Sequence, residues 1–588
     1  MRADPARAKR EGLTLDLDRV AAAGPAALTP DDHYRLKTYG VCAQRHTDLF
    51  MLRMRVPGGR LSPRQVSAVS EAARRFGGGW LHLTTRQNVE LHSIRLQDVP
   101  AIRDLLEPVG LFGRSACGHT VRNVMACPES ATSAEVPFDV QPDAEHLSRV
   151  LVAESEHLNV RLPSRVNIVF GGCSECSTDA LVNDIGLVPT VREGLPGYQV
   201  WVGGSLGSAP RLAFMLRPFL PREQVPAAVW AIIRWYMDEG DLDRPSKGRL
   251  KFVIEEKGEA RFRRYFQKLF EQALESRRIL SEDPAAASSG LGSWREATSP
   301  PPPELFADPL PSVEVLEPPA LDKVLARAPS LGWRPGITPE RRPGLATITV
   351  RIPLGDLLAD ELEKIAELSP DGSLVITRDQ NLLIRSVPTD EVARVCGELG
   401  RLGLGPDGAR GAVDVRSCPG LAFCSIAITA SQPVALQIEK CLSSRLDLPK
   451  DFTVAVSGCP NSCARHQAAD IGLAGGKVRV GGRVGLGYQL MLGADLAKGV
   501  VGEPVLRVLE EEAPSAVVAA VETWVALRRT GERPGETFRR VGLDVVASAI
   551  AMRLRGDPES LGSDASEAGR GGDTGLDSPS ARGNERAA

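Results

Sequence analysis

The sequence predicts an internally duplicated α+β protein whose two halves pack about a pseudo-twofold axis. Blocks of the first half recur in the same order in the second half. Leu83–Asn88 is similar to Val375–Gln380, and Val166–Cys173 is similar to Phe452–Cys459. The latter two blocks are each followed by Asp-Ile-Gly-Leu and then by Gly-Tyr-Gln. Several matched blocks in one order indicate a duplication, at a period far too long for a solenoid.

A proline-rich stretch divides the two halves. Residues 281–343 contain a Ser-Pro-Pro-Pro-Pro run and are typical of an extended linker. Both chain ends are rich in small and polar residues without apolar periodicity, which predicts mobility. The predicted organisation is a flexible segment 1–30, a small β-α-β-type unit 31–110, a larger mixed α/β domain 111–280, the linker 281–343, a second small unit 344–407, a second larger domain 408–555 and a disordered tail 556–588.

Composition narrows the class of protein. The chain of 588 residues is 43% hydrophobic and 25% charged, with a net charge of −3, which is ordinary for a soluble protein and gives no basic field for nucleic acid. No apolar run approaches the length of a membrane span, and no signal-peptide core follows the N-terminus, so we expect a cytoplasmic protein. Eleven cysteines in a reducing compartment indicate metal ligation and core thiols rather than disulfides.

Four cysteines of the second half form two close pairs. Cys418 and Cys424 are separated by five residues in SCPGLAFC, and Cys459 and Cys463 by three in GCPNSC. Thiolates select zinc or iron–sulfur clusters, but zinc ribbons favour two intervening residues, which neither pair has. We interpret this cysteine quartet as the ligand set of one [4Fe-4S] cluster. A four-cysteine zinc site and unrelated core thiols are the alternatives.

The quartet resembles that of the ferredoxin-type nitrite and sulfite reductases, which carry sirohaem coupled to a [4Fe-4S] cluster. The resemblance extends from about Tyr39 to about Val546 and includes the duplication. It implies two ferredoxin-like half-domains, at 31–110 and 344–407, and two mixed α/β domains that bind sirohaem and the cluster. It also implies that Cys463 bridges the cluster to the sirohaem iron.

The resemblance places positively charged residues where the anion binds iron. Local motifs match at Arg53 in MLRMRVPGG, at Arg122 in TVRNVMACP, and at Arg165 and Asn167 in LPSRVN. Arg165 stands where the family has Lys; it keeps the charge but holds its proton more firmly. Asn167 resembles the nitrite-reducing branch, because sulfite reducers usually place a second Lys there.

The family surrounds the sirohaem carboxylates with polar and basic groups. Its Leu-Thr-x-Arg-Gln strand and the segment SKGRLKF supply the matching positions in this chain. Glu90 stands where a Gln is common and would repel a carboxylate-rich macrocycle unless protonated or turned away. The cofactor-binding residues implied are His82, Thr84, Thr85, Arg86, Gln87, Lys247, Arg249 and Lys251.

The resemblance implies an enzyme that reduces nitrite to ammonia or sulfite to sulfide with six electrons, and nitrite is preferred because of Asn167. No strand-to-helix dinucleotide fingerprint is present, so we expect a separate protein such as ferredoxin to supply the electrons. We expect the enzyme itself to be a monomer. An oxygenase resembling precorrin-3B synthase and a non-catalytic electron-transfer protein are the alternatives. The nearly complete set of arginines argues against the oxygenase, and an electron-transfer protein would leave these arginines without a task.

Three cysteines of the first half answer members of the quartet. Cys127 is followed by Pro, as Cys418 is, while Cys173 and Cys176 follow the strand that matches the one before Cys459. No cysteine answers Cys424, and the spacing of the pair is shorter. The sequence therefore favours a vestige or core thiols over a second cluster at this place.

Overall fold

The computed structural model describes residues 4–45, 48–282, 310, 312–315 and 336–556. Most of the predicted linker and nearly all of the predicted tail lie outside these residues. The predicted extent of the linker needs one correction. Residues Ile337–Pro339 form the strand β11, which pairs with β12 of the second half. The second half therefore begins before residue 344.

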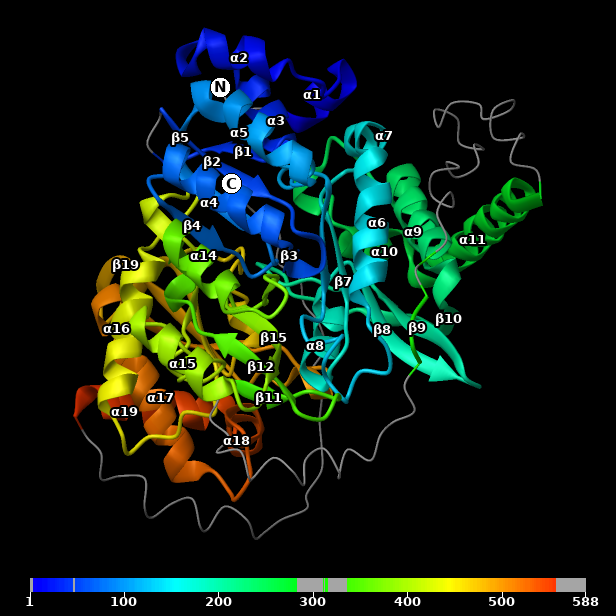
Figure 1. Ribbon diagram of the computed structural model, residues 1–588. Coiled ribbons are helices and arrows are strands. Elements are labelled where there is room, and N and C mark those ends of the chain that lie inside the picture. Colours follow the sequence, from blue (N-terminus) through cyan, green and yellow to red (C-terminus); the bar gives the residue numbers. More distant parts are fainter. Residues whose placement is uncertain (1–3, 46–47, 283–309, 311, 316–335, 557–588) are drawn as a thin grey trace, which may run out of the picture.

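The described residues form four five-stranded sheets, and two of these sheets are built from both halves (Figure 1). β3 of the first half pairs with β14 of the second, and β13 of the second half pairs with β4 of the first. This reciprocal exchange confirms the duplicated ferredoxin-like half-domains. The two sheets, in spatial order, are β1 (Val41–Ala43), β2 (Leu49–Met54), β5 (Val89–Arg95), β4 (Trp80–Leu83) and β13 (Asp356–Leu358); and β11 (Ile337–Pro339), β12 (Leu345–Val350), β15 (Leu382–Pro388), β14 (Leu374–Ile376) and β3 (Arg60–Leu61).

One hydrophobic core joins the two half-domains. It extends from Val20 to Leu399 and includes Leu61 and Leu357 of the exchanged strands. Helices cover these sheets; α4 begins with a capping box in which Ser62 and Gln65 exchange hydrogen bonds, and Pro63 occupies its first turn. The helices of this region are α4 (Pro63–Phe76), α5 (Val99–Leu106), α14 (Ala359–Glu367) and α15 (Val392–Arg401).

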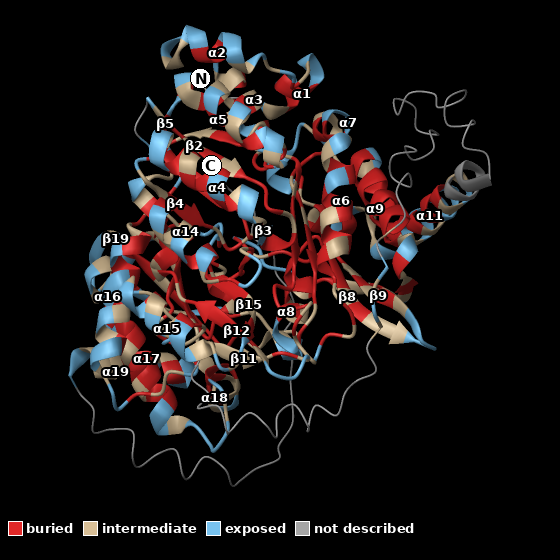
Figure 2. Cartoon of the chain, in the orientation of Figure 1, coloured by how far each residue is buried: buried red, intermediate tan, exposed pale blue. Residues whose placement is uncertain are grey.

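Each mixed α/β domain contains a sheet of two parallel pairings followed by antiparallel ones. Figure 2 shows that the buried residues concentrate in the sheets, beneath partly exposed helices. The first domain comprises β6 (Val121–Ala126), β7 (Val166–Phe170), β8 (Ile185–Arg192), β9 (Leu195–Val202), β10 (Phe214–Pro221), α6 (Gln141–Ala153), α7 (Ser155–Arg161), α8 (Ser174–Ser177), α9 (Val225–Glu239), α10 (Leu250–Lys257) and α11 (Glu259–Glu282). The second comprises β16 (Arg416–Ser417), β17 (Val454–Ser457), β18 (Ile471–Val480), β19 (Arg483–Leu492), β20 (Glu503–Leu509), α16 (Ser431–Ser444), α17 (Ala513–Leu527), α18 (Pro534–Val541) and α19 (Leu543–Arg555).

The N-terminal segment differs from the prediction of mobility. Residues 4–38 form α1 (Pro5–Glu11), α2 (Leu17–Ala23) and α3 (Pro30–Thr38), and Asp4 caps the first of these helices. Lys9 is buried and its Nζ donates a hydrogen bond to the carbonyl oxygen of Leu162. Apolar periodicity was absent because short helices anchor here through a small cluster of Ala8, Leu13 and Tyr34 and through buried polar contacts. In the part of the chain that the structure describes, no helix is long and apolar enough to cross a membrane.

Candidate active site

The cysteine quartet lies at the carboxyl end of two parallel strands. Cys418 directly follows β16, and Cys459 follows β17 through Gly458. The backbone N–H of Cys418 donates to the carbonyl oxygen of Val456 at 3.4 Å, and the N–H of Gly458 donates to the sulfur of Cys418 at 3.2 Å. Because the carboxyl ends of parallel strands meet at one edge of the sheet, residues 40 positions apart in the chain come together.

The spacing of the quartet suits a cluster better than a single ion. Cys463 interacts electrostatically with the other three members, yet among the described residues no three of the four sulfurs lie within 4.8 Å of one another. Four sulfurs on one zinc ion would lie about 3.8 Å apart, given zinc–sulfur bonds of about 2.3 Å. Sulfurs that bind different irons of a cluster must lie farther apart.

Burial makes the last cysteine of the quartet dependent on a positively charged partner. Part of the surface of Cys463 is open to solvent. Its thiol is nevertheless surrounded by protein, and this burial raises the pKa of the thiol to about 12. Its carbonyl oxygen accepts a hydrogen bond from the hydroxyl of Thr85 at 2.7 Å. Bound iron favours the thiolate that burial opposes, while Thr85 fixes the cysteine against the first half.

Three arginines of the first half carry charge that no carboxylate neutralises. Within the described ranges, no Asp or Glu oxygen lies within 4.0 Å of Arg86, Arg122 or Arg165, which we call the cation cluster. Burial, together with the positive charges of neighbouring guanidinium groups, lowers the pKa of Arg86 to about 9 and that of Arg165 to about 10. Arg165 also interacts electrostatically with Cys463. Arg165 therefore links the cation cluster to the quartet, and the uncompensated positive charge of the cluster suits an anion.

Two members of the cation cluster, Arg86 and Arg122, are held by neutral groups. Arg86 donates to the side-chain oxygen of Asn183 and to the carbonyl oxygen of Asn123, each at 3.1 Å. Arg122 donates to the carbonyl oxygens of Ala116 and Gly118 at 2.6 and 2.8 Å. The buried Nε atoms of Arg86 and Arg122 have no hydrogen-bond partner. Each guanidinium is thus fixed in position without losing its charge.

Arg53 occupies a different environment from the cation cluster. Its guanidinium forms a salt bridge with Glu90 at 2.6 Å and donates to the sulfur of Cys117 at 2.9 Å. Although burial opposes the charge, Cys117 and Glu90 hold the pKa of Arg53 well above its ordinary value, and Arg53 holds the pKa of Glu90 well below its own. Glu90 is therefore ionised and turned toward Arg53, which resolves its expected conflict with a carboxylate-rich macrocycle.

Asp184 organises two more of the predicted positions. Both of its oxygens accept hydrogen bonds from Arg249, at 3.0 and 2.9 Å, and one accepts the backbone N–H of Asn167 at 2.9 Å. Asp184 is completely buried, as expected for a carboxylate that is paired and hydrogen-bonded. The side-chain oxygen of Asn167 is buried without a partner. Asn167 therefore retains an acceptor that a ligand could use.

Three positions predicted to contact the cofactor have side chains occupied by protein. His82 forms a contact of 2.6 Å with Asp356 across the exchanged strands, and Thr84 accepts two backbone N–H groups of its own turn. Gln87, fully buried, makes three backbone hydrogen bonds of 2.9 Å to Ala126 and Ile376. His82 and Gln87 thus hold the halves together, while Thr84 stabilises its own turn.

The two lysines of SKGRLKF differ in how far they are exposed to solvent. Lys247 is exposed and lies 4.8 Å above the ring of Phe252. Lys251 is buried, donates to the carbonyl oxygen of Ala209, and has its pKa lowered to about 8 by burial. Of this segment, only Arg249 is directly tied to the residues around the cation cluster.

Sequence reasoning missed Asp184 and Cys117. Asp184 belongs to the repeated Asp-Ile-Gly-Leu block, which was used only as evidence for duplication. Cys117 lies beside Arg53, and a hydrogen bond with Cys42, together with the positive charges of Arg53 and Arg122, lowers the pKa of its thiol to about 6. No local motif distinguished Cys117 from a core thiol.

The residues present fit both predicted cofactors. Four cysteines at separated positions suit a [4Fe-4S] cluster, and a cation cluster with orphaned guanidinium nitrogens suits a macrocycle that carries many carboxylates. The fold and this arrangement define an iron–sulfur oxidoreductase that acts on an anion.

Comparison with known proteins identifies the family. The family model described as "Nitrite and sulphite reductase 4Fe-4S domain" matches residues 117–274 and 408–556, and the "Nitrite/Sulfite reductase ferredoxin-like half domain" matches 43–109 and 339–402. The chain therefore belongs to the nitrite and sulphite reductase family, whose cofactors are sirohaem and a [4Fe-4S] cluster. The predicted family, enzyme class and cofactors are confirmed.

Individual relatives include reductases of both kinds. A ferredoxin–nitrite reductase of Synechococcus elongatus is 29% identical over 501 residues, covering 82% of this chain and 88% of its own. The sulfite reductase (ferredoxin) 1 of Mycolicibacterium paratuberculosis is 27% identical over 458 residues, covering 76% and 74%. The structure of the Mycobacterium tuberculosis NirA protein shares the fold, with a TM-score of 0.72, 24% identity and coverage of 92% and 95%.

Proposed function

We propose that this protein reduces nitrite to ammonia with six electrons, and that sulfite, reduced to sulfide, is the alternative substrate. The observation that carries the proposal is the cation cluster, which has no carboxylate within salt-bridge distance and whose member Arg165 interacts electrostatically with Cys463. A small oxyanion, together with a sirohaem carboxylate at Arg86, supplies the negative charge that these arginines lack. An electron-transfer protein would leave the positive charges of these half-buried arginines without a ligand.

The cysteine quartet holds the redox centre in this proposal. Cys418, Cys424 and Cys459 would hold the cluster, and Cys463 would hold it beside the sirohaem. The two cofactors would supply the chemistry of a six-electron reduction, one electron at a time. The backbone N–H of Gly458, which donates to the sulfur of Cys418, helps to set the cluster potential. Thr85 couples the position of Cys463 to the half that provides the cations.

The cation cluster binds and polarises the substrate. Arg122 and Arg165 donate charge-assisted hydrogen bonds to the anion oxygens and stabilise the negative charge that grows during reduction. Arg86 instead binds a sirohaem carboxylate. Arg53 is already neutralised by Glu90, so its role is to orient this region and to keep Glu90 away from the anion. With a pKa of about 10, Arg165 stays protonated at neutral pH, so water delivers the protons and Arg165 positions it.

Asn167 supports nitrite over sulfite. Relatives with both names have similar identity to this chain, so overall similarity does not choose between the substrates. Sulfite reducers of the family usually place Lys at this position, and a neutral amide leaves less positive charge for the more highly charged sulfite. The free side-chain oxygen of Asn167 can accept a hydrogen bond from water that is released or protonated during nitrite reduction.

Electrons come from a separate protein in this proposal. The nitrite reductase and sulfite reductase relatives are named for ferredoxin, and we propose a ferredoxin as the donor here. The encounter depends on charge and therefore weakens as salt concentration rises. We further propose that the enzyme acts as a monomer in the cytoplasm.

The test is steady-state reduction with reduced methyl viologen, with nitrite and sulfite compared by kcat/KM. We expect a higher value for nitrite, and a lower one would make sulfite the substrate. Arg122→Ala should reduce kcat/KM for the preferred anion while the visible spectrum of cluster and sirohaem stays unchanged. The surface change Arg95→Ala is the matched control. Full activity of Arg122→Ala would remove Arg122 from the anion site, and iron–sulfur absorption without sirohaem bands would overturn the proposal.

A further inference from the structure

Three cysteines of the first half converge in the protein interior. Cys127 follows β6, Cys173 follows β7, and Cys176 lies in α8. Their exposed fractions are 1%, 5% and 6%. Among the described residues, they are the group of three whose ligand atoms all lie within 4.8 Å of one another. Their sulfurs thus meet in one small, buried volume that the cofactors proposed above do not use.

The three cysteines occupy the position in the first half that corresponds to the position of the quartet in the second half. The N–H of Cys127 donates to the carbonyl oxygen of Phe170 on the adjacent parallel strand at 3.0 Å, just as Cys418 does to Val456. The N–H of Cys173 donates to the sulfur of Cys127 at 3.5 Å, as Gly458 does to that of Cys418. Both sites therefore offer a backbone donor to the sulfur of their first cysteine, an arrangement that favours a bound thiolate.

The two sites differ in the distance between sulfurs. The sulfurs of Cys127 and Cys173 are 3.8 Å apart, which equals the edge of about 3.8 Å expected for a tetrahedron of zinc–sulfur bonds of about 2.3 Å. Two intervening residues between Cys173 and Cys176 match the spacing of zinc knuckles, unlike the wider pairs of the quartet. This spacing is too tight for thiolates that bind different irons and too wide for a disulfide bond of about 2.05 Å.

We propose that Cys127, Cys173 and Cys176 bind one zinc ion. The protein then contributes three thiolates, and the fourth position is left to a water molecule or another small ligand, because no other His, Cys, Asp or Glu atom of the described residues joins the group. Gly172 makes the site possible, since a Cβ there would lie 2.6 Å from the sulfur of Cys127. The proposal does not depend on the nitrite or sulfite chemistry.

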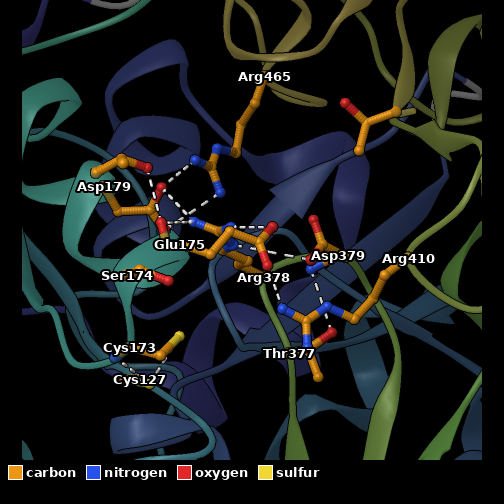
Figure 3. A network of polar contacts seen from close by, with 12 residues as sticks. Cys127, Cys173, Ser174, Glu175, Asp179, Thr377, Arg378, Asp379, Arg410 and Arg465 are labelled. Carbon is orange, nitrogen blue, oxygen red and sulfur yellow. Dashed lines mark hydrogen bonds and ion pairs between the residues drawn. The ribbon is translucent and has the colours of Figure 1, made fainter. Parts of the chain in front are cut away.

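Charged residues of the second half help to fix the segment that carries these first-half cysteines. Glu175, between Cys173 and Cys176, pairs with Arg378 at 2.5 Å and also with Arg410, which in turn contacts Glu129 at 2.9 Å. Figure 3 shows Glu175, Arg378 and Arg410 in the same region as Cys127 and Cys173. Three thiolates and one divalent cation leave one negative charge, and the positive charge of Arg378, which also pairs with Glu175, favours the thiolate of Cys173.

Further ion pairs link this network to the quartet. Asp179, which follows α8, pairs with Arg378 at 2.9 Å and with Arg465, two residues after Cys463. A zinc ion would therefore tie the ends of β6 and β7 and the helix α8 to the interface on which the quartet rests. Its role is structural, because metal binding stabilises the folded state in which the ligands converge.

The test is metal analysis of the full-length holoenzyme purified without chelators in the presence of zinc sulfate. We expect about one zinc per chain besides the iron of the cluster and sirohaem, and zinc-edge X-ray absorption with about three sulfurs at about 2.3 Å. The variants Cys127→Ala and Cys176→Ser should each lose the zinc while iron content and the visible spectrum persist. Cys441→Ala, outside the group, should keep the zinc.

The wild-type protein alone can refute the proposal, so a variant that fails to fold leaves it testable. Zinc at background level in wild-type protein would overturn it. Additional iron in place of zinc, which would indicate a second cluster, or a disulfide between any two of the three cysteines by mass spectrometry, would do so too. Zinc that survives in a folded Cys176→Ser variant would place the ion elsewhere.

Discussion

Gln87 offers a sharp test of how the two halves are joined. Its side chain is fully buried, and its three backbone hydrogen bonds of 2.9 Å reach Ala126 in its own half and Ile376 in the other. Gln380 makes the equivalent contacts in reverse, to Leu83, Leu354 and Ser417. The change Gln87→Met keeps the volume of the side chain but removes every one of these bonds.

The expected loss of stability follows from the groups left without partners. Two carbonyl oxygens and one N–H lose a bond in the interior, and an unmet buried polar group costs about 1–3 kcal/mol. Because a carbonyl oxygen can keep a second partner, we expect a total of about 4 kcal/mol. If about 500 residues unfold together, the unfolding entropy is about 1 kcal/mol/K, so Tm should fall by about 4 °C.

The assay is thermal unfolding followed by circular dichroism, together with the sirohaem absorption of the folded enzyme. Gln380→Met should produce a similar fall in Tm, and Gln97→Met, at an exposed position, should leave Tm unchanged. The sirohaem spectrum of folded Gln87→Met should match that of the wild type. An unchanged Tm accompanied by loss of sirohaem would refute the reasoning and return Gln87 to the cofactor contacts implied by the family.

Three further changes test other parts of the structure. Burial lowers the pKa of Lys9 from 10.5 to about 7, so the unfolded state binds more protons between these values, and stability should rise by about 2 kcal/mol from pH 7 to pH 9. Lys9→Met should flatten that rise in urea titrations, and an unchanged slope would contradict the assignment. Asp184→Asn breaks a buried ion pair with Arg249 and should cost about 3–5 kcal/mol in the same titrations, whereas a loss below 1 kcal/mol would mean that the pair is solvated. Arg86→Ala should weaken sirohaem retention by the equivalent of about 1.5–3 kcal/mol, measured as haem content after dialysis, and full retention would exclude Arg86 as a carboxylate contact.

Local motifs predicted much of the fold and of the redox centre. Repeated blocks in one order disclosed the duplication, and the spacings of Cys418–Cys424 and Cys459–Cys463 indicated a cluster rather than zinc, because ligand spacing is a local property of the chain. The N-terminal helices were missed because the contacts that hold them are made with residues far away in the chain. Their anchor is a single buried lysine and a few apolar contacts with residue 162 and its neighbours, and no local periodicity encodes such contacts.

The exchanged strands, by contrast, could not be read from the chain. β3 and β13 are only two and three residues long, and each pairs with the opposite half, so no periodicity marks them. Gly59 and Gly355 show how closely the halves approach there. Both have a positive φ, of 78° and 76°, and a Cβ on either would lie 2.5 Å from a carbonyl oxygen of the other half. Such approaches depend on the packing of two distant segments.

The sequence by itself determined the duplication, the family and the cysteine quartet, since each is written in residue types at fixed spacing. Only the tertiary structure decided which charges are neutralised. Glu90 turns to Arg53 and Asp184 to Arg249, which leaves Arg86, Arg122 and Arg165 for anions. It also decided that three first-half cysteines meet within 4.8 Å. Coulomb and coordination energies depend on distance in space, and folding sets those distances between residues far apart in the chain.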